Sequence, residues 1–189
     1  MLARAESSAL AQLSGPSWGL LPACLFMPWL ATHTGAGQGN LLLMALFGLI
    51  MASYDLATLR IPNQLNALAA CCGLAVAGAA GGWSALAQAL AGGFVAFGLM
   101  AVFFFLGAVG AGDVKALGAL GVFVGGWGAL ELFLLTVLCG GALALLRILA
   151  AHGPGGLKRW WVAGKGLKLP YGLAICAGAL WLALLKGAA

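Results

Sequence analysis

The sequence predicts an all-α, polytopic membrane protein, a bundle of six to seven transmembrane helices that forms one membrane-embedded domain over residues 1–189. Its residues are 63% hydrophobic and only 7% charged, and the mean hydropathy is +1.08. Soluble chains carry roughly 25% charged residues. The 9 basic and 4 acidic residues are too few to solvate a surface of this size, so the bilayer must be the solvent. This composition excludes a cytosolic enzyme, a secreted disulfide scaffold and a nucleic-acid binder, despite the net charge of +5.

The N-terminal part of the chain is the least regular. Residues 1–17 form a polar segment without a basic region followed by a cleavage site, so we expect no removable signal peptide. The first apolar stretch, Trp18–His33, is short and is interrupted by Pro22 and Pro28. This stretch is therefore the weakest of the expected spans, and if it does not cross the membrane only Arg4 changes side.

The remaining apolar segments are separated by glycine, proline and charge, the usual signals for turns. We expect helices over Asn40–Leu59, Gln64–Ala80, Ser84–Val109, Asp113–Gly125, Trp127–Ala150 and Pro170–Lys186. Asn63 and Ser84 are suitable N-caps because their side-chain oxygens can accept from free backbone N–H groups. Only the basic, glycine-rich segment His152–Leu169 is long enough to be a sizeable loop.

The distribution of basic residues predicts the topology, because Lys and Arg collect in cytoplasmic loops. With a cytoplasmic N-terminus, only Lys186 falls outside. The cytoplasmic side receives Arg4, Arg60, Lys115, Arg147, Lys158, Arg159, Lys165 and Lys168. The Trp160-Trp161 pair among these cations is typical of an anchor on anionic membrane lipid.

Two of the four acidic residues, Asp55 and Asp113, are predicted at the cytoplasmic ends of apolar helices. Counting from Asn40 at about 1.5 Å per residue places Asp55 roughly 22 Å along a layer about 30 Å thick. A carboxylate at the centre of a membrane helix costs on the order of 2.5–3.5 kcal/mol, and less near the interface. Two acids at equal depth on one side therefore indicate a function.

Paired carboxylates can hydrolyse a peptide bond without a metal or a cofactor. Two acids within a few ångströms share a proton. The ionised one can draw a proton from water, and the protonated one can hydrogen-bond the carbonyl under attack. Gly110 and Gly112 would let the backbone approach the opposing helix and leave room for a substrate strand. The alternative is that each aspartate caps a helix or forms a salt bridge with Arg60 or Lys115.

Four motifs occur in order, namely Ser53-Tyr54-Asp55, Arg60-Ile61-Pro62-Asn63, Gly110-Ala111-Gly112-Asp113-Val114-Lys115 and Leu169-Pro170-Tyr171-Gly172. Together they resemble the type IV prepilin peptidases, the bacterial G-x-G-D aspartic membrane proteases, over about residues 40–186. The resemblance implies catalytic roles for Asp55 and Asp113. Supporting roles would fall on Gly110, Gly112, Lys115, Arg60, Pro62, Asn63 and Pro170, although Arg60 and Lys115 are also typical interface anchors.

The chain resembles the short form of this family, which serves tight-adherence (Flp-type) pili. Long members carry an extra cytoplasmic region with paired C-x-x-C motifs that is associated with N-methylation, and the five cysteines here form no such pair. The resemblance implies a multi-pass protein of the bacterial cytoplasmic (inner) membrane with its active site at the cytoplasmic face. Its partners would be prepilin and pseudopilin precursors, in which a short basic leader ending in Gly precedes a hydrophobic helix.

Three alternatives stay open. The first is an archaeal preflagellin-type peptidase. The second is a presenilin-like or signal-peptide-peptidase-like protease, but those carry Pro-Ala-Leu where this chain has Pro170-Tyr171-Gly172. The third, from a different class, is a small proton-coupled transporter that uses Asp55 and Asp113 as a relay. Inverted repeats would favour a transporter, and we find none in the sequence. The sequence has no metal-ligand cluster, P-loop or serine-hydrolase motif, so we expect no metal and no cofactor.

Overall fold

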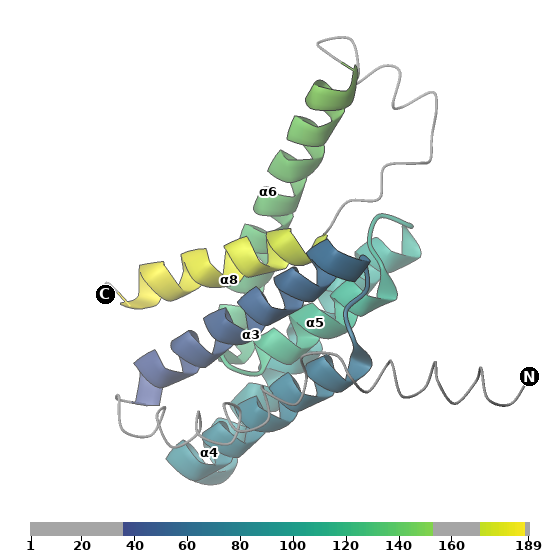
Figure 1. Cartoon of the computed structure of the whole chain (residues 1–189). Helices are drawn as coiled ribbons and strands as arrows, with labels where there is room; N and C mark the ends of the chain where they lie inside the picture. Colours follow the sequence, from purple (N-terminus) through teal and green to yellow (C-terminus); the bar gives the residue numbers. More distant parts are fainter. Residues whose placement is uncertain (1–35, 153–170, 188–189) are drawn as a thin grey trace, which may run out of the picture.

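The computed structural model describes residues 36–152 and 171–187, and every element in these ranges is a helix (Figure 1). The helices are α3 (Ala36–Thr58), α4 (Asn63–Phe105), α5 (Ala111–Gly121), α6 (Gly125–His152) and α8 (Tyr171–Gly187). The expected polar segment 1–17, the first apolar stretch Trp18–His33, Pro170 and the basic loop after His152 lie outside the described residues. The all-helical fold class is confirmed for the described part of the chain.

The connection between α3 and α4 has a cap that differs from the expected one. The chain leaves α3 through Leu59, which has a left-handed φ of 51° and donates its N–H to the carbonyl of Asp55 at 2.8 Å. Pro62, in extended conformation (φ −61°, ψ 135°), then occupies the N-cap position of α4. The prediction that Asn63 caps this helix is wrong. Asn63 is the first helical residue, and its side chain bonds to another helix.

α4 consists of two arms, because Gly81 and Gly82 leave the helical conformation. Gly82 has φ 59° and ψ −145°, a region that residues with a Cβ rarely enter. The expected turn is therefore present, and we call residues 63–80 the first arm and 83–105 the second arm. Ser84 does not act as the expected N-cap acceptor, because its hydroxyl donates to the carbonyl of Gly81 at 3.2 Å.

The two arms run in opposite directions along α5. In the first arm, Asn63 contacts Lys115 early in α5, and Gly73 lies against Val122 just after α5 ends. In the second arm the order is reversed, because Gly92 lies against Gly121 and Phe97 against Gly118. A Cβ at Gly121 would fall 2.6 Å from the carbonyl oxygen of Gly92, so this crossing needs glycine on both helices.

α8 packs antiparallel against both α3 and α6. α3 and α8 lie side by side in Figure 1. Against α3, Gly172 contacts Asp55, and Cys176 contacts Gly48. Against α6, Tyr171 lies on Gly140 and Gly178 on Thr136. At the far end of α8, Lys186 forms a 2.7 Å salt bridge with Glu131. α5 is buried along most of its length, at Val114 and over residues 116–121, while Lys115 is exposed.

Three described helices are long and apolar enough to cross a membrane. They are α3 over Gln38–Thr58, α4 over Asn63–Phe105 and α6 over Gly125–Arg147. α8 is apolar but shorter. The part of α6 beyond Gly140 is largely exposed and projects away from the other helices (Figure 1). These findings indicate a multi-pass membrane protein, while the expected count of six to seven spans is not confirmed.

Candidate active site

Asp55 and Asp113 line one pocket of about 520 Å³. Its wall is assembled from the end of α3, the connection to α4, the segment 107–110, the first turns of α5 and the start of α8. The segment 107–110 follows the C-cap of α4 at Leu106, and Gly107, with a left-handed φ of 75°, turns the chain toward α5. The fold therefore brings together two acids that are far apart in the sequence.

Asp55 is buried, with 5% of its surface exposed, and is held by the first turn of α8. The backbone N–H of Gly172 donates to its Oδ2 at 2.7 Å. The first N–H groups of a helix have no partner within the helix, and the helix dipole favours a negative charge at that end. The start of α8 therefore both positions the carboxylate of Asp55 and stabilises its charge.

Glycine is required at position 172 because the backbone of α8 approaches Asp55 closely. A Cβ there would lie 2.7 Å from Cβ, 2.9 Å from Oδ2 and 3.1 Å from Cγ of Asp55. Contacts under 3.0 Å essentially never occur for real Cβ atoms, so one of the two helices would have to move. The hydrogen bond to Asp55 depends on the small size of Gly172.

Asp113 lies in the first turn of α5, where its Oδ2 accepts the N–H of Gly110 at 3.0 Å. This contact makes Asp113 a cap of its own helix, as the structural alternative expected. In the described part of the chain, however, Oδ1 of Asp113 and Oδ1 of Asp55 have no hydrogen-bond partner. The two carboxylates are also close enough to repel each other when both are charged. Two such groups favour sharing one proton.

The salt-bridge alternative finds no support in the described residues. Within 36–152 and 171–187 the ion pair is that of Lys186 with Glu131, and neither aspartate pairs with Arg60 or Lys115. Lys115 instead donates from Nζ to Oδ1 of Asn63 at 3.0 Å. This bond joins the start of α4 to the first turns of α5, so Lys115 does more than reach the membrane surface.

We expected Gly110 and Gly112 to let the backbone approach the opposing helix, and the contacts at both positions are of another kind. A Cβ at Gly112 would make ordinary contacts of 3.8–3.9 Å with Ile61. A Cβ at Gly110 would lie 3.2 Å from Oδ2 of Asp113, which is tight. Gly110 thus leaves space for the carboxylate of Asp113, while helix packing does not require a glycine at position 112. That Gly112 makes room for a substrate stays a prediction.

Most of the predicted supporting residues lie at this pocket. Arg60, Asn63, Gly110, Gly112 and Lys115 line it. Pro62 is not among the lining residues and acts as the N-cap position of α4, and Pro170 lies outside the described residues.

Two residues that contact the site were not selected from the sequence, although both belong to the last of the four motifs. Tyr171 lines the pocket, with its hydroxyl against the backbone of Gly140, and Gly172 bonds Asp55. A Tyr-Gly step at the start of the last apolar helix was the available signal. Among the described residues, no His, Cys or further acid joins the two aspartates in a group of three that could hold a metal ion.

The fold and this pocket define a helical membrane protein with two carboxylates from separate helices in one site. Residues 41–145 match the type IV leader peptidase family, and since this range is more than half of the chain, the protein belongs to that family. It is therefore a leader-peptidase-like protease, and the family implies precursors of the prepilin type as substrates. No curated protein and no solved structure matches the chain.

Proposed function

We propose that this protein is an aspartic endopeptidase of the bacterial cytoplasmic membrane that removes the short leader peptide from type IV prepilin-like, Flp-type precursors. The observation that carries the proposal is the shared pocket, in which Asp55 and Asp113 each keep Oδ1 without a partner among the described residues. The family match supplies the reaction class, because it makes the chain a leader peptidase.

The chemistry follows from one proton shared by two carboxylates. The ionised aspartate takes a proton from a water molecule as the water oxygen bonds to the scissile carbonyl carbon. The protonated aspartate donates a hydrogen bond to the carbonyl oxygen, where negative charge develops. The carbon–nitrogen bond then breaks, and the leaving amine takes the proton that the first aspartate had accepted. The hydrogen bonds from Gly172 and Gly110 would hold both carboxylates still during these steps.

The charge distribution supports an active site at the cytoplasmic face. Arg60 and Lys115, both assigned to the cytoplasmic side by the charge bias, line the pocket. Lys186, which the same bias places outside, lies at the opposite end of α8 from Gly172. A protein with six to seven spans, as the sequence predicts, would satisfy this arrangement.

Replacing each aspartate by asparagine tests the proposal. Asp55→Asn and Asp113→Asn should abolish trimming of a co-expressed precursor, measured by its size on a gel, because an amide cannot share a proton with the remaining acid. Both variants should still reach the membrane at wild-type levels. Glu131→Gln is the matched control, since this acid is exposed and lies outside the pocket, and it should trim normally. Normal trimming by a well-expressed Asp113→Asn variant would refute the two-aspartate mechanism.

A further inference from the structure

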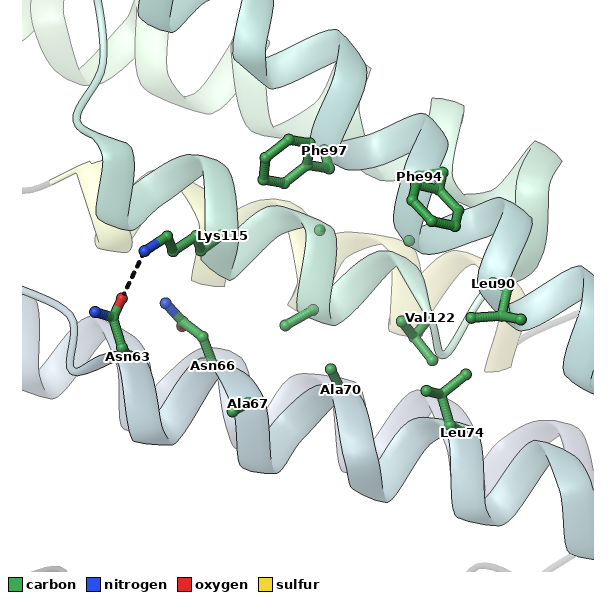
Figure 2. A pocket seen from close by; sticks show the side chains of 13 residues that line it. Asn63, Asn66, Ala67, Ala70, Leu74, Leu90, Phe94, Phe97, Lys115 and Val122 are labelled. Atoms are coloured by element: carbon green, nitrogen blue, oxygen red, sulfur yellow. Dashed lines mark hydrogen bonds between the residues drawn. The ribbon is translucent and has the colours of Figure 1, made fainter.

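A second hollow, of about 630 Å³, lies between the two arms of α4 and along α5 (Figure 2). Its sides are mainly apolar. Ala70 and Leu74 come from the first arm, and Leu90, Phe94 and Phe97 come from the second. Val122 lies just after α5 ends. Phe94 is 74% exposed, so the hollow is open along the second arm. We call this hollow the α4 groove.

The α4 groove begins where the aspartate pocket ends. Asn63 and Lys115 line both of them, and the 3.0 Å hydrogen bond between these two side chains spans the junction. A chain that passes between Asp55 and Asp113 can therefore continue past Asn63 and Lys115 into the groove without leaving the protein surface. Lys115 has three donors and uses one on Asn63, so its charged end can also bind a carbonyl or carboxylate at this junction.

Asn66 is the third polar residue that lines the groove, after Asn63 and Lys115. It lies one turn beyond Asn63 on the first arm and is only 5% exposed, yet among residues 36–152 and 171–187 neither its Nδ2 nor its Oδ1 has a hydrogen-bond partner. Figure 2 shows its side chain pointing from the first arm into the groove, toward the side of Lys115. A buried polar group without a partner costs about 1–3 kcal/mol. This cost is explained if the amide is satisfied by a ligand.

We propose that the α4 groove binds the apolar stretch of the precursor that follows the scissile bond, and that Asn66 positions this stretch by bonding one of its peptide groups. The inference rests on the proposed endopeptidase function and assigns its substrate subsite. The free N–H and C=O of Asn66 match the donor and acceptor of a peptide group, and close to the scissile bond the first N–H groups of the apolar helix have no partner within that helix. A lipid acyl chain would fill the apolar walls but would leave both atoms of the amide unpaired.

The first test compares two precursors cleaved by the purified full chain. One carries its natural apolar stretch, and in the other this stretch is replaced by a Gly/Ser sequence of equal length. In Asn66→Leu the amide is replaced by an apolar side chain of similar size. With the apolar precursor this variant should lose roughly 5- to 150-fold in kcat/KM, mainly through KM. With the Gly/Ser precursor the loss should be absent or much smaller.

Thr136→Val is the matched control. Thr136 is fully buried, and its Oγ1 also has no partner in the described part of the chain, but it lies on α6 against Gly178 of α8, outside the α4 groove. Both variants exchange an unpaired buried polar group for an apolar one, so both should unfold at the wild-type temperature or above. Only Asn66→Leu should change KM. Equal losses on the two precursors, equal effects of the two variants, or wild-type kinetics for Asn66→Leu would overturn the proposal.

A second measurement identifies the occupant directly. A photoreactive amino acid in place of Ala70 should crosslink to the apolar precursor in membranes, whereas the same group at the exposed Ala75 of the first arm should not. Crosslinks from position 70 to lipid alone would overturn the proposal in favour of a lipid site. If the wild-type enzyme cleaves neither precursor, the proposed function itself fails, which is a distinct result.

Discussion

Gly172→Ala tests whether the active site depends on the close contact between α8 and Asp55. The added Cβ would lie 2.7 Å from Cβ of Asp55, an atom fixed to the backbone of α3 that no rotation about χ1 can move. Overpacking of this kind typically costs about 1–3 kcal/mol. For a chain of 189 residues this corresponds to a fall in Tm of roughly 2–12 °C. The two helices must therefore separate, which displaces the carboxylate of Asp55, and a misplacement of about 1 Å can lower the rate about 100-fold.

The assay measures both quantities on the same purified protein. Thermal unfolding in detergent gives the change in Tm, and the time course of precursor cleavage gives kcat and KM, of which kcat should fall by about two orders of magnitude. Gly78→Ala is the control, because a Cβ at this helical glycine would meet nothing within 4 Å. It should cleave normally and be slightly more stable, since alanine favours a helix by about 0.5–1 kcal/mol. The reasoning is refuted if Gly172→Ala cleaves at the wild-type rate or cannot be distinguished from Gly78→Ala.

Three further predictions follow from the site and the topology. Gly112→Ala should keep the wild-type Tm within about 2 °C, because its Cβ would contact Ile61 at ordinary distances, and a larger fall would show that helix packing needs this glycine. Single cysteines introduced at Gly155 and Gly187 of a Cys-free chain should react with membrane-impermeant thiol reagents from opposite sides of the membrane, the cysteine at position 155 from the cytoplasm. Labelling of both cysteines from the same side would contradict the predicted topology. Chelators and serine-directed reagents should leave cleavage unchanged, and a variant without its five cysteines should remain active. Cleavage should fall on either side of the pH range in which the two aspartates share one proton. If a chelator stops cleavage and zinc restores it, the two-aspartate mechanism is excluded.

The sequence alone determined that this protein lies in a lipid bilayer and approximately where its helices begin and end. Helix length and hydropathy are local properties, set by the thickness of the bilayer and by the cost of placing a charge in it. For this reason α3, α6 and α8 begin and end within a few residues of the predicted bounds, and the break at Gly81 and Gly82 was expected. The same scarcity of charge made Asp55 and Asp113 conspicuous, and the order of the four motifs indicated the family that the comparison confirmed.

The tertiary structure decided which helix faces meet. In a membrane, apolar residues that face lipid and apolar residues that face protein have the same composition, so hydropathy does not distinguish them. The role of Gly172 arises only because α8 starts beside the end of α3, and the unpaired amide of Asn66 is significant only because the two arms of α4 leave a groove beside it. The caps predicted at Asn63 and Ser84 were wrong for a related reason. A polar side chain at a helix start bonds whichever group the neighbouring chain brings within reach, and here Asn63 bonds Lys115 of α5 while Ser84 bonds the carbonyl of Gly81.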